Sequence, residues 1–381
     1  MINIFEPSLG EDDLNAIRKV FVSKWIGKGD VVNLFEKNFA NSLNSNPENF
    51  LSTTSCTEGI FLASKLFNFN KNDEIILPSI SFPSIASSIS ESSAKIVFCD
   101  VEKNTLNPTA EIISNHITKR TKAVFLTHYG GFPIDFDPIK KICDKNNIII
   151  IEDSACAVKS FYKGKACGTL GDMGIWSFDA MKTLSTVDGG MIYLKNRKLV
   201  EKAKMLLYLG LPLKTKSGID SSDDGIDKWW EFDILNYGRR AIMNNVTAAI
   251  GNVQLQKLDR YLMKRKEIYD FYFENLNKIE ELDIVNDKYY DFEFKSSYYF
   301  YWIQSKKRDE LAGFLKENGV YTTFRYFPLH KIKLFGKSDC ELPNSDFVND
   351  VTLNIPIHHN LSKTDVKKIA DLIQSFFNTK K

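Results

Sequence analysis

Reactive side chains concentrate in one stretch of the chain, residues 148–191. Glu152 and Asp153 end a strongly apolar run there, a glycine-rich segment follows, and Lys182 stands five residues after Ser177. Small and apolar neighbours disfavour the ammonium form of a lysine, so we expect a lowered pKa and a nucleophilic amine at Lys182. A solvated surface position is the alternative, and it is the commoner one for any lysine considered alone.

Two further features suggest that a ligand binds near this stretch. Asp153 ends a strand, and open α/β sheets bind ligands at the carboxyl ends of their strands, so its carboxylate could hold a cationic ring nitrogen. The small hydroxyl residues of STTSCTEGI (52–60) precede a helix-period run, and a helix start of this kind can bind phosphate. Helix N-capping is the alternative for both.

An aromatic residue completes the set. Phe82 follows the strand-like run 74–78 and could stack on a planar ring, although a single Phe is more often part of the core. Together, a lysine for a covalent link, an acid for a pyridinium nitrogen, a helix start with Ser177 for phosphate and an aromatic cover are what pyridoxal phosphate requires.

The elements that must position these residues alternate between strand-like and helical. Apolar runs without alternation predict buried strands of a mostly parallel sheet covered on both faces, which is an α/β fold. These runs are 74–78, 95–100, 122–129, 148–153, 174–178 and 189–194. Helical periodicity marks 60–67 and 138–145 between them.

The second half of the chain suggests a linker helix and a smaller lobe. Residues 214–230 are polar and predict a long surface loop, and a long amphipathic helix starts at Asn245. We predict a large domain at 13–250 and a small C-terminal α+β domain at 251–381, with residues 1–12 packing on the small domain. Ser362 and Asp365 predict the N-cap of a last helix.

Composition excludes several classes of protein. The 381 residues carry 50 basic and 48 acidic side chains, and this balance argues against nucleic acid or a membrane surface as the main partner. No apolar run is long enough to span a bilayer, and the N-terminus lacks the pattern of a secretory signal. Six scattered cysteines without a CxxC pair and only five histidines favour a reducing, cytoplasmic setting with no metal site.

The sequence resembles a known family, the DegT/DnrJ/EryC1/StrS sugar-nucleotide aminotransferases, which are pyridoxal-phosphate enzymes of fold type I. The resemblance runs from about Pro7 to Phe376 and rests on many motifs in the same order. These include SCTEGI, PSISFPSIASSI, THYGGFPIDFDPI, IIEDSACAV, YKGKACGTLGDMGIWSFDAMKTLSTVDGGM, NNVTAAIGNVQLQKLDR, RYFPLH and LNIPIHHNLS.

The resemblance implies roles for individual residues. Lys182 matches the lysine that carries the cofactor, and Asp153 matches the acid that pairs with its ring nitrogen. Thr57 and Glu58 match positions that hold the phosphate through backbone and hydroxyl groups. Ser177 matches the serine that shares the phosphate, and Phe82 matches the aromatic that stacks on the ring.

Four positions depart from the family pattern. Cys156 stands at a cofactor-side position where Gln or His is usual, Asp179 replaces a His, and Asp188 replaces a Glu. Arg240 stands where an Asn usually reaches the phosphate of the neighbouring subunit's cofactor, and its guanidinium could make the same contact.

The resemblance also implies the reaction. L-Glutamate would donate an amino group to a nucleotide-linked keto sugar, most simply dTDP-4-keto-6-deoxy-D-glucose for a surface glycan such as O-antigen. UDP- or GDP-linked 4-keto sugars and 3-keto sugars remain open. The resemblance further implies a homodimer with shared active sites. Arg325 and His330 are candidates for substrate contact, with a structural role in the small lobe as the alternative.

Two other classes of protein fit the sequence less well. A nucleotide-dependent oxidoreductase needs a GxGxxG turn after its first strand, and the chain has none. A non-catalytic binding protein of the same fold would most simply lack the lysine or the acid, and both are present. A dehydrating branch of the family has histidine in place of the lysine, so Lys182 favours transamination.

Overall fold

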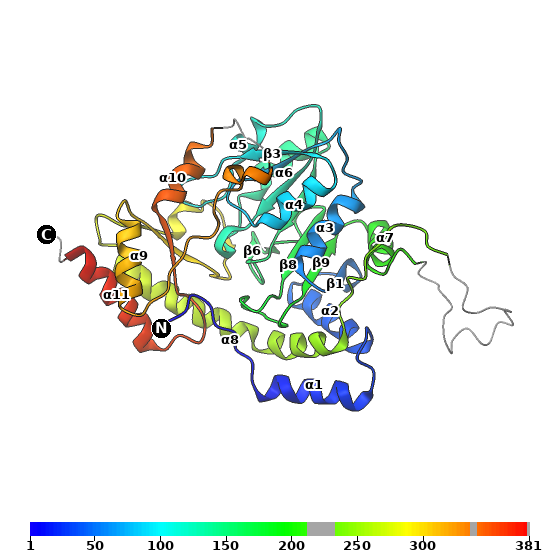
Figure 1. Cartoon of the computed structure of the whole chain (residues 1–381), viewed down its shortest axis with the longest axis horizontal. Coiled ribbons are helices and arrows are strands. Elements are labelled where there is room, and N and C mark those ends of the chain that lie inside the picture. The colour runs from blue at the N-terminus through cyan, green and yellow to red at the C-terminus, as the bar shows by residue number, and fades with distance from the viewer. Residues whose placement is uncertain (212–232, 336–340, 379–381) are drawn as a thin grey trace.

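A central seven-stranded sheet organises the larger part of the molecule. The computed structural model describes residues 1–211, 233–335 and 341–378 (Figure 1). The strand order is β1-β9-β8-β5-β4-β2-β3, and only β9 runs antiparallel to its neighbours. The strands are β1 (Phe50–Thr53), β2 (Glu74–Pro78), β3 (Lys95–Cys99), β4 (Thr121–Thr127), β5 (Ile149–Asp153), β8 (Met173–Ser177) and β9 (Gly190–Leu194).

Both faces of this sheet are buried, which explains the continuous apolar strands. Ile75 and Leu77 pack on one face in a core built with α3 (Cys56–Leu66), α4 (Pro83–Glu91) and α7 (Arg197–Leu207). Ile76, between them in the chain, packs on the other face with α5 (Ala110–Ser114) and α6 (Phe136–Asn146). The prediction of a mostly parallel sheet with helices on both faces is confirmed.

A long helix connects the two lobes. The helix α8 (Asn245–Leu276) begins at the N-cap Asn244, whose side chain accepts from the amides of Val246 and Thr247. Its first half packs with α2 (Asp30–Ser42) on the large sheet, and its second half lies in the core of the small lobe. The predicted boundary between residues 250 and 251 therefore falls inside one continuous helix.

The small lobe is an α+β unit, as the sequence predicts. A three-stranded sheet has the order β10-β12-β13, and three helices cover it together with the second half of α8. The elements are β10 (Asp283–Ile284), β12 (Tyr301–Gln304), α9 (Arg308–Glu317), α10 (Pro343–Val351), β13 (Thr352–Ile355) and α11 (Lys363–Asn378). Ser362 and Asp365 exchange side-chain and backbone hydrogen bonds at the start of α11, so the predicted cap is present.

The N-terminal segment lies on this lobe rather than on the large sheet (Figure 1). Ile2 donates to the carbonyl of Gly319 and accepts from the amide of Tyr321. Helix α1 (Glu11–Ser23) then packs along the outside of α8. A third, small sheet pairs β11 (Phe294–Lys295) with β6 (Phe161–Tyr162) and β7 (Lys165–Ala166), and it ties the lobes together.

Some of the sequence predictions fall on residues outside the described part of the chain. The surface loop predicted at 214–230 lies outside the described residues, as does Cys340. Among the described residues, none of the helices combines the length and apolar character needed to cross a bilayer. The same residues contain no cluster of three His, Cys, Asp or Glu side chains suited to a metal ion, and their five cysteines are free thiols.

Candidate functional site

A cavity of about 380 Å³ lies where the carboxyl ends of the central strands meet the small lobe. Strand ends contribute Thr127, Asp153 and Ser177, while Tyr299, Arg325 and Tyr326 come from the small lobe. The other residues around the cavity are Ser55, Cys56, Thr57, Ile60, Phe82, Ala155, Cys156, Asp179, Met181, Lys182 and Asp188. The cavity thus gathers most of the predicted site residues into one place.

Lys182 lies on the loop between β8 and β9 and points into this cavity. Its Nζ is 3.5 Å from Cys156 Sγ and 4.7 Å from the centre of the Tyr299 ring. Burial lowers the pKa of the Lys182 amine, but Cys156, Tyr299, Tyr326 and Cys56 raise it, and the net direction is upward. The expectation of a lowered lysine pKa is therefore wrong, because the sequence did not reveal the thiols and phenols around the amine.

Asp153 ends β5 with its carboxylate buried at the cavity wall. One carboxylate oxygen, Oδ1, accepts from the amide of Ala155 at 3.0 Å. Burial raises the pKa of this carboxyl, while the Ala155 amide, Lys182 and His128 oppose the rise. Among the described residues no ion pair within 4 Å involves Asp153, so a cationic group in the cavity would be its natural partner.

Its neighbour Glu152 has a different function, because adjacent residues of a strand face opposite sides of the sheet. The Glu152 carboxylate is fully buried and accepts from the backbone amides of Gly168, Leu170 and Gly171. It also lies 2.9 Å from His128 Nε2. Glu152 therefore anchors the glycine-rich segment that leads into β8.

The N-terminus of α3 borders the cavity. Ser55 caps the helix by accepting from the amide of Glu58, and Cys56 and Thr57 follow in the first turn. Amides of a first helical turn have no acceptor within the helix and attract anions. Gly190 of β9 lies against this turn, and a Cβ there would be 2.7 Å from the amide nitrogen of Cys56. Ser177 borders the cavity as well.

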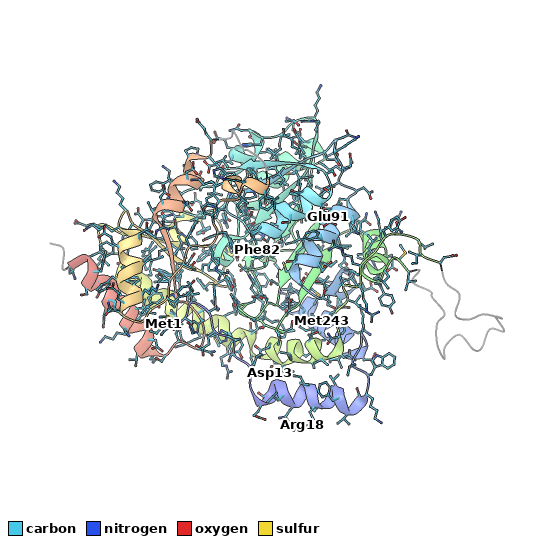
Figure 2. All side chains as sticks on the ribbon, in the orientation of Figure 1. Met1, Asp13, Arg18, Phe82, Glu91 and Met243 are labelled. Carbon is cyan, nitrogen blue, oxygen red and sulfur yellow. The ribbon has the colours of Figure 1, made fainter. Side chains whose placement is uncertain are left out.

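The aromatic wall combines predicted and unpredicted residues. Phe82 is 44% exposed and meets the ring of Tyr326 edge-on, with centroids 5.6 Å apart. Figure 2 shows Phe82 between the large sheet and the small lobe. The side chain of Tyr326 also hydrogen-bonds that of Cys156. Phe82 is thus an exposed aromatic at the cavity and not a core residue.

Three predicted site residues lie outside the cavity. Glu58 directs its carboxylate to Arg239, 3.3 Å away. His330 is buried, with Nδ1 2.6 Å from Ser79 Oγ and Nε2 3.2 Å from Asp346. Both its ring nitrogens therefore have partners, one directly after β2 of the large lobe and the other in α10 of the small lobe.

Arg240 borders a separate cavity of about 410 Å³. Its guanidinium lies over the ring of Tyr208, 5.3 Å from the ring centre. Lys28 and Lys204 border the same cavity, together with the exposed Trp25. This second cavity is therefore basic and partly apolar.

Sequence reasoning missed Thr127, Tyr299 and Tyr326 as cavity residues. Thr127 pairs with Asp153 across β4 and β5, and its buried hydroxyl has no hydrogen-bond partner among the described residues. The tyrosines are distant from the lysine in sequence. Tyr326 was within reach, because it belongs to the same RYFPLH motif as Arg325.

The described residues fit pyridoxal phosphate. Lys182 supplies an amine inside the cavity, Asp153 a buried carboxylate without a cation, and the first turn of α3 a set of free amides. The unpaired Thr127 hydroxyl beside Asp153 offers another polar contact. This arrangement can bind a phosphorylated cationic ring covalently and move protons beside it.

Comparison with known proteins identifies relatives along nearly the whole chain. The model of the DegT/DnrJ/EryC1/StrS aminotransferase family matches residues 7–374. A dTDP-4-dehydro-2,3,6-trideoxy-D-glucose 4-aminotransferase of Saccharopolyspora spinosa is 41% identical over 379 residues, which cover 98% of this chain and 96% of the relative.

Two further relatives match this chain along its whole length. The crystal structure of the aminotransferase TlmJ from Streptoalloteichus hindustanus superposes with a TM-score of 0.92 at 41% identity, covering 100% of this chain and 99% of that chain. A GDP-perosamine synthase of Escherichia coli O157:H7 is 27% identical, covering 100% of this chain and 99% of the relative.

Proposed function

Since this chain belongs to the DegT/DnrJ/EryC1/StrS aminotransferase family, we propose that it moves an amino group from L-glutamate to a nucleotide-linked 4-keto-6-deoxyhexose. Membership makes it a pyridoxal-phosphate-dependent sugar aminotransferase of fold type I. The amino donor, the sugar and the residue roles are the proposal.

The observation that carries it is the meeting of Lys182 and Asp153 in one buried cavity beside the first turn of α3. The lysine amine can bind a carbonyl carbon covalently, and the acid can hold a protonated ring nitrogen. The helix start can hold a phosphate. These three contacts fix both ends and the plane of a single ring, which a simple binding site for a sugar would not need.

In this mechanism the chain binds, orients and moves protons, and bound pyridoxal phosphate supplies an electron-withdrawing ring for the reacting carbon. Asp153 keeps a proton on the ring nitrogen. Lys182, once its amine is free, would remove a proton from the α-carbon of glutamate as general base and deliver it as general acid to C4′, the cofactor carbon next to the transferred nitrogen. Phe82 and Tyr326 cover the cavity and keep bulk water from the amine.

One cavity must accept two unlike substrates in turn. Arg325 is the cation that borders it besides Lys182 among the described residues. We propose that Arg325 meets an anionic group of each, a carboxylate of glutamate or the diphosphate of the nucleotide sugar. The geometry of His330, with both ring nitrogens engaged, favours the structural alternative for that residue.

The proposed sugar follows from the Saccharopolyspora relative. Its name specifies a dTDP-linked 4-keto sugar aminated at C4, at 41% identity over nearly the full chain. We therefore place dTDP-4-keto-6-deoxy-D-glucose first, and the 2,3,6-trideoxy sugar of that relative beside it. The GDP-perosamine synthase keeps GDP-linked 4-keto sugars among the alternatives, together with UDP-linked and 3-keto sugars. We propose a cytoplasmic role in supplying an amino sugar for a surface glycan.

We propose further that the enzyme is a homodimer with shared sites. A hydrophobic surface patch, named here the α1 patch, lies on and near α1. It consists of Leu14, Phe21, Val22, Trp25, Ile26 and Leu34. Exposed apolar patches of this kind mark interfaces. The basic cavity with Arg240 borders the patch through Trp25, so a partner seated there would receive Arg240 near its own cofactor phosphate.

The test is the absorption spectrum of the purified holoenzyme before and after L-glutamate is added. We expect a yellow band that bleaches as the cofactor takes up the amino group, followed by transfer to one member of a panel of dTDP-, UDP- and GDP-linked keto sugars. A protein that stays colourless with added pyridoxal phosphate would instead support the non-catalytic binding protein. Bleaching without transfer to any dTDP-4-keto sugar would exclude the proposed sugar alone.

A further inference from the structure

Tyr299 is a buried residue of the small lobe that reaches the cavity of the large lobe. It lies just before β12, in a segment that also contains Ser296, Ser297 and Tyr298. Its side chain is 3% exposed and borders the cavity. Ser297 Oγ donates to the carbonyl of Cys156 at 2.6 Å, so this segment is fastened to the turn that follows Asp153.

The Tyr299 side chain contacts the loop of Lys182 in two independent ways. The Nζ atom of Lys182 lies 4.7 Å from the ring centre, within the range of a cation–π contact. The Tyr299 hydroxyl donates to the carbonyl of Met181 at 3.3 Å, and Met181 directly precedes the lysine. One contact therefore positions the amine, and the other positions the backbone that carries it.

Other residues hold Tyr299 in this orientation. Arg265 of α8 is fully buried, and its Nη1 donates to the carbonyls of Tyr298 and Tyr299 at 3.2 Å each. The guanidinium of Arg265 is 5.5 Å from the Tyr299 ring centre. Phe5 of the N-terminal segment stacks on the same ring, with centroids 5.4 Å apart and an interplanar angle of 18°. The tyrosine is thus fixed from α8 and from the N-terminus.

We propose that Tyr299 is a positioning residue for the catalytic lysine: its ring stabilises the cationic nitrogen of Lys182, and its hydroxyl sets the loop that presents it. The proposal rests on Lys182 as the residue that carries the cofactor. A buried phenol without a function would need only a hydrogen bond, but this one lies against the reacting nitrogen.

Several titratable groups face the Lys182 amine and share in its titration. Asp153 ends β5, Cys156 lies in the turn that follows it, and Cys56 lies in the first turn of α3. Tyr326 faces it from the small lobe. None of these groups is changed in the variants below, so differences between variants report on Tyr299.

The experiment titrates the absorption band of the holoenzyme, which changes when the nitrogen that joins Lys182 to the cofactor loses its proton. Tyr299→Leu removes the ring and should lower the midpoint by roughly 0.5 to 1 pH unit, the size expected for one cation–π contact. Tyr299→Phe keeps the ring and should keep the wild-type midpoint. In Tyr299→Phe, loss of the hydrogen bond from the hydroxyl to the Met181 carbonyl should lower kcat about 2- to 10-fold, with KM for glutamate unchanged.

A matched control comes from the same core. Tyr301 is fully buried in β12 and its hydroxyl has no partner among the described residues. Tyr301→Leu should reduce stability like Tyr299→Leu but leave the midpoint where it is. If Tyr299→Leu does not fold, the Tyr299→Phe chain made with ring-fluorinated phenylalanine at this position weakens the π face at nearly constant shape, and the midpoint should fall with fluorination.

Two results would overturn the inference in distinguishable ways. Borohydride reduction followed by peptide mass spectrometry locates the cofactor in the wild-type chain, and attachment to a residue other than Lys182 would remove the premise. Attachment to Lys182 with the same midpoint in Tyr299→Leu, or in the fluorinated series, would remove the role of Tyr299 and leave the proposed function intact.

Discussion

Asp153 is the residue whose charge state decides whether the site can work as proposed. Its carboxylate is buried and, among the described residues, accepts a hydrogen bond only from the Ala155 amide, so the protonated ring nitrogen would be its main partner. Asp153→Asn should reduce turnover by about 10- to 100-fold, the value of one charge-assisted hydrogen bond. Steady-state kinetics with saturating cofactor measure this, and an unchanged rate would remove Asp153 from the site.

A second prediction at the residue scale concerns Lys182. Lys182→Ala should abolish transamination, a loss of at least about 100-fold for a general base, because no other described lysine borders the cavity. The variant should still bind the cofactor without a covalent link, which dialysis and absorption measure. Lys163→Ala, a change on an exposed residue, should behave like the wild type. Near-normal turnover of Lys182→Ala would contradict its assignment.

At this scale, local sequence patterns predicted most of the cavity residues of the large lobe, though not Thr127, and only Arg325 of those from the small lobe. Lys182, Asp153, Thr57, Ser177 and Phe82 lie beside strand ends or helix starts, where short-range rules apply, and all five border the cavity. Tyr299 reaches Lys182 only through the docking of the lobes. The pKa direction of Lys182 was wrong for the same reason, since Cys156 and the tyrosines approach it through the fold.

At the scale of elements, Glu152 holds the segment between β7 and β8. Its two carboxylate oxygens accept from three backbone amides and lie beside His128. Glu152→Gln would direct an NH₂ group at amide donors and leave at least one buried donor unpaired. We expect a loss of about 1–3 kcal/mol in the free energy of unfolding. Urea titration measures it, and a stability equal to that of the wild type would contradict this role.

A second prediction at the scale of elements concerns the stability of the folded protein in acid. It involves His358 and His359, which follow β13 and lie near α8. Burial, and then the nearby Arg265 charge, lower the pKa of His358 to about 4 and that of His359 to about 3. In the unfolded chain the two imidazoles take up protons near pH 6.5, whereas in the folded chain they stay neutral to lower pH. The free energy of unfolding should therefore be unaffected above pH 6.5 and should fall as the pH drops toward 4.

His359→Phe isolates this effect. The ring of His359 stacks on Tyr261 with centroids 3.9 Å apart, and phenylalanine retains that stacking without titrating. Urea titrations at pH 7.5 and pH 5 should show a smaller acid-induced loss for the variant, by about 1–2 kcal/mol. Parallel pH profiles of the two proteins would rule out His359 as a source of the acid sensitivity.

Strand positions were more predictable than strand directions. The bounds of the six predicted strands agree with the observed bounds to within about two residues, because burial on both faces produces a continuous run of apolar residues. The reversed direction of β9 depends on its pairing with β1 and β8, which composition does not encode. The two-residue strands β6, β7 and β11 are too short to carry a period.

At the scale of the whole molecule, the proposed dimer predicts a coupling between assembly and activity. The wild-type chain should sediment as a dimer. Phe21→Asp, at a side chain that is 60% exposed in the α1 patch, should yield a folded monomer with little activity, because Arg240 would no longer reach a partner's site. Leu334→Asp, at an exposed residue outside the patch, serves as the control. A fully active monomer would contradict both the dimer and the shared site.

The sequence predicts two lobes, and the predicted boundary between them falls within the continuous helix α8. The long amphipathic pattern indicated a linking helix, and α8 does link the lobes. It also contributes buried residues to both cores, so a division after residue 250 cuts through packed structure. Periodicity identifies a helix, whereas the two surfaces that it packs against depend on contacts distant in sequence.

The pairing of the first residues with the small lobe has a consequence for synthesis on the ribosome. Ile2 forms its bridge with Val320, and His358 lies within hydrogen-bonding distance of the carbonyl of Asn3. The strands of the large sheet all emerge well before these partners, so that sheet can assemble while translation continues. Ile2 and Asn3 therefore remain without these partners until Val320 and His358 have been translated. Closing this longest loop, and with it the placement of Phe5 on Tyr299, should therefore be among the final steps of folding.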